Sequence, residues 1–203
     1  VTEDKRIASG SHRGNISISS YDLERKKCKR EIHKKAHDDS WVTALCPLNG
    51  NRLLSGGRDG LIKVWSLSDV DLTLIKEIKG HTWIVRKVIP LSKERFASCS
   101  TDGTVKIWKD DNTYECISTL QHDGGVNSIL QLRGKEVLVS TYGGYGTSSL
   151  PCGVSFWNIN DYTHQHTIMG YTVYGPTSMI ELSNGNIALS SNDKPYPIVI
   201  IDS

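Results

Sequence analysis

Histidine, serine and aspartate, the residue types of a hydrolytic catalytic triad, occur together in this chain of 203 residues. His37, Ser55 and Asp59 form one such set, and a second set returns with its aspartate 43 residues further along. In a triad, the serine would be the nucleophile and the histidine its base. A tryptophan also follows each aspartate after six residues, and a triad does not require it.

The tryptophans indicate that these residues belong to an internal repeat. The segment LLSGGRDGLIKVWSL at 53–67 returns as FASCSTDGTVKIWKD at 96–110. A third copy, VLVSTYGGYGTSSLPCGVSFWNI at 137–159, is longer between its apolar runs. Degraded copies, IASGSHRGNISISSY and IALSSNDKPYPIVIID, lie towards the two ends of the sequence. Residues that recur in register are expected to serve packing, because each repeat is a structural unit that stacks on its neighbours.

Each repeat is predicted to consist of β-strands. Runs such as WVTALCPL, RLLSG and LIKVWSL show alternating polarity, many β-branched side chains, and glycine or polar breaks. No long stretch shows the 3.6-residue period of an amphipathic helix. Four short strands in each repeat of about 40–45 residues are typical of a β-propeller blade.

The sequence resembles the WD-repeat (WD40) β-propellers over nearly its whole length. The resemblance is carried by Gly80 and His81, by the Asp-Gly pairs at 59–60 and 102–103, and by the recurring tryptophans. It implies an all-β fold of about four to five four-stranded antiparallel blades. These blades would form an open arc, which would be the central section of a larger, seven-bladed ring. The expected parts are a partial blade at 7–36, full blades at 41–79, 84–120 and 126–169, and a partial blade at 177–202.

The resemblance also implies a structural role for the repeated polar residues. In WD40 blades, a histidine, a serine, the turn aspartate and a tryptophan form a buried hydrogen-bonded set. A satisfied network can hold the connection between two blades, whereas unpaired buried groups would be costly. The matching residues are His37, Ser55, Asp59 and Trp65; His81, Ser98, Asp102 and Trp108; and His122, Ser140 and Trp157, where no aspartate matches.

These assignments favour a non-catalytic scaffold for protein–protein interaction over an enzyme. Packing accounts for every recurring His, Ser and Asp, and we expect no catalytic residue, cofactor or metal. His164 and His166 would share one face of a strand but have no third ligand nearby in the sequence. The alternatives are a hydrolase-like propeller enzyme, or a propeller that binds nucleic acid or phosphoinositide through the basic run at 25–35.

The loops before the inner strands, together with the aspartate turns, form the usual docking face of the family. Tryptophan and arginine are over-represented at interface hot spots, and arginine suits a carboxylate or phosphate on a peptide. A protein or peptide ligand, acidic or phosphorylated, is therefore the expected partner. The alternative is that the tryptophans cover the seams between blades. The expected contact residues are Trp41, Thr43, Arg58, Trp83, Ile84, Arg86, Thr101, Gly125 and Asn127.

The formal net charge of +2 gives no general reason to expect a nucleic acid or membrane partner. The run RKKCKREIHKK at 25–35 is an exception, with seven lysines and arginines and one glutamate. We expect it on the connection between the third and outer strands of the first blade. There it would be a solvated edge or part of a nuclear localisation signal.

The five cysteines are widely spaced and form no CxxC pair. Cys46, Cys99 and Cys116 lie in apolar runs and are predicted to be reduced core residues. Reduced cysteines favour a cytoplasmic or nuclear protein. The glycine-rich insertion at 141–151 is predicted to be a long mobile loop on the docking face.

Overall fold

The computed structural model describes residues 6–22, 24–143, 152–170, 176–190 and 198–202. All regular elements in these ranges are β-strands, which form five sheets. The described residues therefore include no helix that could cross a membrane. The chain divides into two compact units, residues 1–90 and 91–203.

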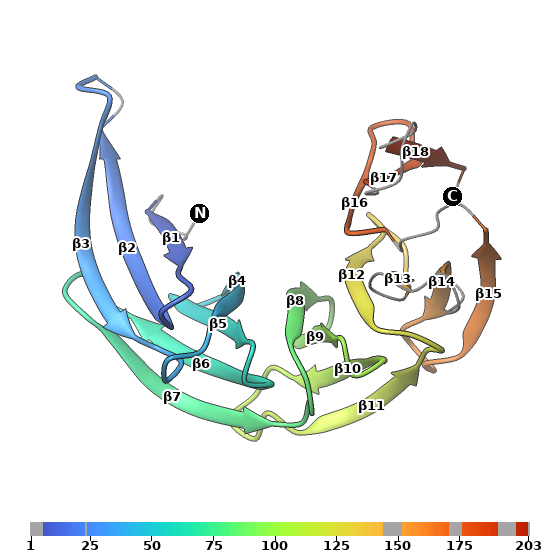
Figure 1. The fold of residues 1–203 in the computed structure, drawn as a ribbon, viewed down its shortest axis with the longest axis horizontal. Coiled ribbons are helices and arrows are strands. Elements are labelled where there is room, and N and C mark those ends of the chain that lie inside the picture. Colours follow the sequence, from blue (N-terminus) through green and yellow to red (C-terminus); the bar gives the residue numbers. More distant parts are fainter. Residues whose placement is uncertain (1–5, 23, 144–151, 171–175, 191–197, 203) are drawn as a thin grey trace. The chain divides into compact units, whose positions relative to one another are not determined.

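The first unit contains two antiparallel sheets and the strand β8 (Figure 1). One sheet has three strands, β1 (Ile7–Gly10), β2 (Asn15–Asp22) and β3 (Lys27–Lys35). The other has four strands, β4 (Val42–Leu48), β5 (Arg52–Gly57), β6 (Leu61–Leu67) and β7 (Leu72–Lys79). In both sheets the strands follow their order in the sequence, as successive hairpins require.

The second unit repeats this plan. Strands β9 (Arg95–Ser100), β10 (Thr104–Lys109) and β11 (Cys116–Gln121) follow β8 (Val85–Leu91) in the sheet order. The next sheet has β12 (Val126–Gln131), β13 (Val137–Tyr142), β14 (Gly153–Asn158) and β15 (His164–Met169). A three-stranded sheet follows, with β16 (Ser178–Glu181), β17 (Ile187–Ser190) and β18 (Ile198–Ile201).

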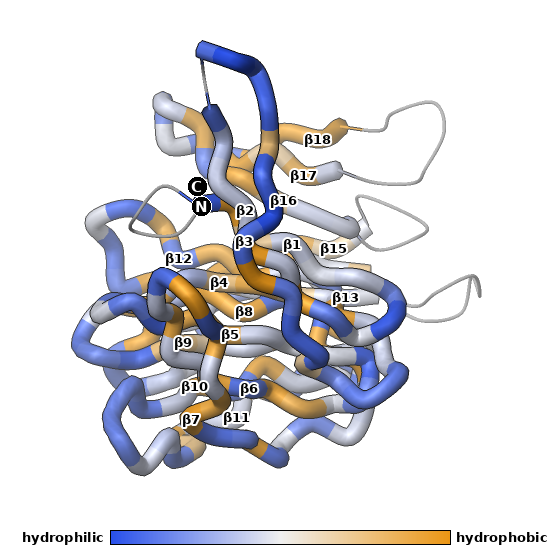
Figure 2. Tube along the Cα trace, turned by 90° about the vertical axis from the view of Figure 1, so that its left-hand side faces the viewer, coloured by the Kyte–Doolittle hydropathy of each residue, from blue (hydrophilic) through white to orange (hydrophobic). Residues whose placement is uncertain are grey.

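Position within a sheet decides how much of each strand is buried. The second strands β5, β9 and β13 are buried along nearly their whole length, so they read as continuous apolar or small-residue runs. The outer strands β7, β11 and β15 expose half or more of their residues, and Figure 2 shows hydrophilic residues along the turns. The core therefore lies between the faces of neighbouring sheets.

In the first unit, the two sheets share one apolar core. Ile16, Ile18 and Ile32 of the first sheet pack in one cluster with apolar residues of β5, β6 and β7. In the second unit, Val139, Val154 and Phe156 cluster in the same way with Met179, Ile187, Leu189 and Ile201 of the last sheet. Burial of such side chains contributes about 25 cal/mol per Å² of apolar area.

The turn between β5 and β6 requires glycine at its last position. Gly60 has a φ of +80°, a conformation that side chains with a Cβ rarely adopt. A Cβ at Gly60 would also lie 2.7 Å from the carbonyl oxygen of His81. The recurring Asp-Gly pair thus places the aspartate beside a tight turn that packs against the next connection.

Two predictions about individual segments are wrong. Cys46 and Cys99 are buried as predicted, but Cys116 is exposed, because it begins the outer strand β11. The basic run is not a connection: residues 27–35 are strand β3 itself, paired with β2 as far as Asp22 and Lys27. Of the predicted loop at 141–151, Thr141 and Tyr142 belong to β13, and residues 144–151 lie outside the described residues.

Candidate functional site

A chain of hydrogen bonds connects Trp65, Ser55, His37 and Asp59 inside the first unit. Trp65 Nε1 donates to Ser55 Oγ at 2.8 Å, and Ser55 Oγ lies 2.9 Å from His37 Nε2. His37 Nδ1 lies 2.8 Å from Asp59 Oδ2. A carboxylate can only accept a hydrogen bond, so His37 Nδ1 carries a hydrogen atom and donates a hydrogen bond to Asp59. In neutral His37, Nε2 then accepts from the Ser55 hydroxyl, and the whole chain of bonds runs in one direction.

Two strands, the turn between them and a separate connection supply these groups. Ser55 lies on β5, Trp65 on β6 and Asp59 in the turn between them, while His37 follows β3. Gly57 makes the arrangement possible, because a Cβ there would collide with Asp59 Oδ1 and His37 Nδ1. The repeat therefore brings the four residues together by packing one connection against one hairpin turn.

Burial rules out the triad chemistry for this set as it stands. His37 and Ser55 are fully buried, so a substrate cannot reach the serine oxygen. Asp59 lies at the rim, with 22% of its side chain exposed. Its burial acts to raise the pKa of Asp59, but hydrogen bonds from His37 and from the Leu61 amide hold that pKa below its usual value. Asp59 is therefore a carboxylate that anchors the histidine.

The second set is divided between the two units. In the second unit, Trp108 Nε1 donates to Ser98 Oγ at 2.8 Å. Asp102 Oδ1 accepts from the Thr104 amide at 3.0 Å and from its hydroxyl at 2.7 Å. His81, in the first unit, is buried.

The third set lacks the carboxylate. Ser140 Oγ accepts from Trp157 Nε1 at 3.0 Å and lies 2.7 Å from His122 Nε2. His122 Nδ1 is buried and has no hydrogen-bond partner in the described ranges. Burial lowers the pKa of His122 to about 4, so the ring is neutral at neutral pH. The repeat position of Asp59 falls outside the described residues.

The most accessible of the predicted contact residues, Trp41, Arg58 and Trp83, lie in the first unit. The Arg58 guanidinium carbon lies 4.9 Å from the centre of the Trp41 ring, and the Arg58 amide donates to the Trp41 carbonyl. The ring of His12 meets Trp41 edge-on, with centroids 4.4 Å apart. Trp83 lies next to the turn that contains Arg58 and Gly60. Its carbonyl oxygen is 3.2 Å from where a Cβ of Gly60 would lie. We call His12, Trp41, Arg58 and Trp83 the Trp41 surface.

Exposure distinguishes these residues from the other predicted contacts. Trp41 is 43% exposed and Trp83 is 65% exposed. By contrast, Thr43 is half-buried and donates to the Val85 carbonyl. The remaining predicted contacts are half-buried or buried: Ile84, Arg86, Thr101, Gly125 and Asn127.

Sequence reasoning missed His12. It lies in the degraded first copy, where SHRG at 11–14 stands in the place of GRDG at 57–60. The repeat register therefore puts His12 at the position of Arg58. That correspondence could have identified it as a surface residue.

The comparison with protein families decides the identity of the repeat. The family described as WD domain, G-beta repeat matches residues 26–66 and 72–109. These two segments are WD40 repeats. The two matched stretches contain both complete Asp-Gly turns and two of the network tryptophans.

Two curated proteins match parts of this WD40-repeat chain. A probable cytosolic Fe-S cluster assembly factor of Schizosaccharomyces japonicus is 33% identical over 72 residues, which are 35% of this chain and 12% of that protein. An uncharacterised WD repeat-containing protein of Acanthamoeba polyphaga mimivirus is 47% identical over 38 residues, which are 19% of this chain and 29% of that protein. The matched segments span less than a third of either relative.

Solved structures cover the chain more fully. A chain in the crystal structure of the mitotic checkpoint complex matches with a TM-score of 0.79 and 20% identity, over 98% of this chain and 58% of that one. The computationally designed Ika4 protein matches with a TM-score of 0.64 and 22% identity, over 82% of this chain and 93% of its own. The all-β WD40 propeller fold predicted from the sequence is thereby confirmed, while the size of the complete ring stays a prediction.

Proposed function

We propose that this WD40-repeat chain is a non-catalytic scaffold that binds a protein or peptide partner through the Trp41 surface. The observation that carries the proposal is the stack of Arg58 on the half-exposed ring of Trp41. WD40 propellers typically act as scaffolds for protein interaction, and one structural neighbour comes from a multiprotein complex.

The chemistry of the Trp41 surface fits an acidic or phosphorylated segment. Arg58 has no acidic partner among the described residues, so its N–H groups remain available while its flat face rests on Trp41. A guanidinium held in this way can donate two parallel hydrogen bonds to a carboxylate or phosphate. The exposed ring of Trp83 adds apolar area of the kind that anchors interfaces.

The experiment compares partners co-purified with the tagged full-length protein and with an Arg58→Glu, Trp83→Ala variant. We expect the variant to lose partners that the unchanged protein retains, because the charge is reversed and the anchor removed. Lys76→Glu, on the exposed outer strand β7, is the control and should keep them. Equal recovery of partners by all three proteins would contradict the proposal.

The same proposal includes a cytoplasmic or nuclear location. All five cysteines are free, and the buried thiols Cys46, Cys99 and Cys152 lie within the fold without forming disulfides. Free thiols favour a reducing compartment. Imaging of the tagged full-length protein tests this location, and a secreted or lumenal signal would contradict it.

A further inference from the structure

The hairpin of β2 and β3 extends beyond the rest of its sheet. β1 pairs only with Ile16–Ser19 of β2, whereas β2 and β3 stay paired as far as Asp22 and Lys27. The outer half of the hairpin is therefore a two-stranded ribbon with no third strand among the described residues, as Figure 1 shows. We call Lys27–Arg30, together with their β2 partners, the basic ribbon.

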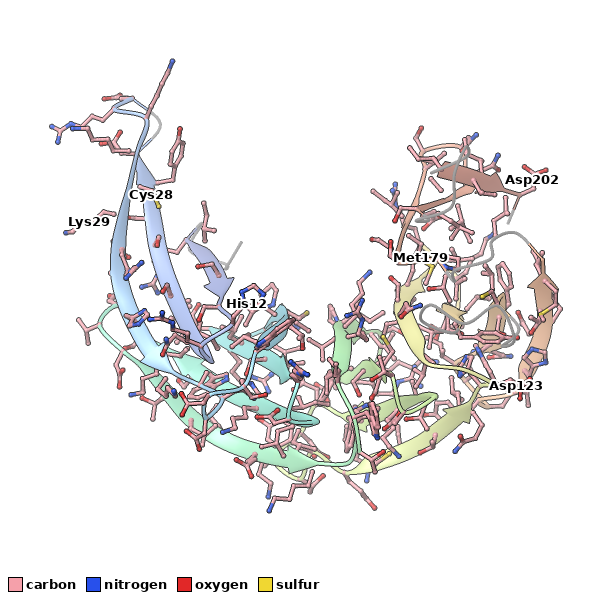
Figure 3. The ribbon with its side chains drawn as sticks, viewed as in Figure 1. His12, Cys28, Lys29, Asp123, Met179 and Asp202 are labelled. Atoms are coloured by element: carbon pink, nitrogen blue, oxygen red, sulfur yellow. The ribbon has the colours of Figure 1, made fainter. Side chains whose placement is uncertain are left out.

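Part of the positive charge on this hairpin is already paired. Lys34 lies 3.2 Å from Asp71, and Lys35 lies 2.6 Å from Asp39. Lys27, Lys29 and Arg30 have no acidic partner among the described residues and are exposed. Figure 3 shows Lys29 projecting outward from β3, and Figure 2 shows the end of the hairpin as hydrophilic.

A cavity of about 530 Å³ lies beside the basic ribbon. Arg6 is 8% exposed there and donates to the Ser68 carbonyl at 3.0 Å. Positive groups outnumber negative ones in the lining, which consists of Arg6, Lys29, Arg30, Glu31 and Asp69. Arg6 lies 3.7 Å from Glu31 and is paired with it, so Lys29 and Arg30 supply the positive charge that can accept an acidic side chain at the base of the ribbon.

The backbone of β3 offers a second means of recognition. β3 is the last strand of its sheet, so its outer edge has no strand partner in the described part of the chain. Lysines on such an edge prevent pairing with another copy of the same strand. They do not prevent pairing with a segment of opposite charge, and an exposed edge can take an added strand from a peptide.

We propose that the basic ribbon binds an acidic polypeptide segment, which adds to the outer edge of β3 as an extended strand. Lys27 and Lys29 lie on the same face, two residues apart, so acidic side chains at alternate positions of the added strand would face them. The register shift in β3 opposite Ile18 and Ser19 limits the regular edge to about the length of the basic ribbon. This surface is separate from the Trp41 surface.

The same features disfavour nucleic acid. A nucleic acid makes no use of an unpaired strand edge, which is the feature that suits a polypeptide. Tyr21 is the one exposed aromatic residue on the ribbon, which gives little surface for stacking bases.

The test measures fluorescence anisotropy of a labelled peptide in which glutamate alternates with threonine, at about 0.15 M salt. We expect binding by the unchanged protein and an affinity lowered at least about tenfold by Lys27→Glu with Lys29→Glu, because attraction becomes repulsion. The matched control is Lys76→Glu with Lys79→Glu on the exposed outer strand β7, which should bind as the unchanged protein does. Thermal unfolding of each variant checks that it is folded.

Two further probes separate strand addition from simple charge attraction. The same peptide methylated on alternate backbone nitrogens should bind more weakly, because it cannot complete the edge hydrogen bonds. Equal binding of the methylated peptide, no binding of the parent peptide, or tighter binding of a DNA duplex of equal charge would each overturn the proposal. The Arg58→Glu, Trp83→Ala variant is measured with the same peptide. If that variant loses binding while Lys27→Glu with Lys29→Glu keeps it, the peptide binds the Trp41 surface and this proposal is overturned, whereas the opposite result supports it.

Discussion

The ring of Tyr142 lies against the ring of His122, with the centroids 5.3 Å apart. Tyr142 stands at the repeat position that Gly57 holds in the first unit, where the missing side chain leaves room for Asp59 beside His37. His37 therefore has a carboxylate at Nδ1, whereas Nδ1 of His122 has an aromatic ring nearby and no partner among the described residues. Two histidines at the same repeat position thus have different neighbours at Nδ1.

We expect His122 to make the second unit less stable in mild acid. Burial lowers the pKa of His122 from 6.5 to about 4. Between these two values the unfolded chain binds a proton that folded His122 does not, so the free energy of unfolding falls as the pH falls through this window. The full loss would be on the order of 3 kcal/mol. Urea unfolding at neutral pH and near pH 5 measures it.

A matched pair of variants tests the assignment to His122. His122→Gln cannot gain a proton, so it should remove most of the pH dependence even if the protein is less stable at neutral pH. His33 is exposed on β3, and His33→Gln should leave the pH dependence as it is. If the free energy of unfolding of His122→Gln depends on pH as steeply as that of the unchanged protein, other groups cause the effect.

Asp59→Ala should destabilise the first unit by about 2 kcal/mol, because His37 Nδ1 would lose its charged acceptor inside the fold. The pKa of Asp59 is held below 3.8, so this stabilisation is present at neutral pH and is lost as the pH falls through the lowered value. Asp59→Asn keeps an acceptor oxygen and should cost less. Asp38→Ala removes an exposed carboxylate and is the control in chemical denaturation. Equal losses in all three variants would contradict the role of Asp59.

Gly57→Ala should be destabilising by about 1–3 kcal/mol, because the added Cβ collides with Asp59 Oδ1 and His37 Nδ1. The double variant Gly57→Ala, Asp59→Ala removes one of the two groups that the methyl meets. We therefore expect the double variant to lose less stability than the two single losses added together. Strict additivity in urea unfolding would show that the methyl finds room elsewhere.

The repeat register predicts much of this arrangement but not its degree of burial. Ser55 and Trp65 recur at fixed distances because each sheet packs in the same way, and their hydrogen bond follows that register. The register does not reveal that Asp59 sits at the rim, because exposure depends on what covers the turn. The register does align His12 with Arg58, but the first copy has changed the residues around His12, so the type of residue differs from that in the other copies.

The errors at Cys116 and in the basic run have a common cause. An outer strand has one covered edge and one open edge, so its sequence can look apolar or highly charged without changing its hydrogen bonding. Cys116 begins β11 in an exposed position although apolar residues follow it. β3 is a strand although it is rich in lysine, because its backbone pairs with β2 while its side chains remain in solvent. Sequence periodicity indicates which side chains are buried. In these two outer strands the backbone is paired although many side chains are exposed, so periodicity does not reveal the strand.

Glu181→Ala should loosen the last sheet of the second unit. Glu181 is 8% exposed, and its Oε2 accepts from the Arg133 amide at 2.8 Å, while Arg133 Nη2 donates to the Glu181 carbonyl at 2.8 Å. Removing the carboxylate leaves that amide without its acceptor, which should cost about 1–3 kcal/mol. Faster amide hydrogen exchange in β16 and β17 would report this loss of stability.

Glu115→Ala, which breaks an exposed pair with Lys109, is the control and should have little effect. Equal exchange in E181A and the unchanged protein would show that apolar packing alone holds this sheet.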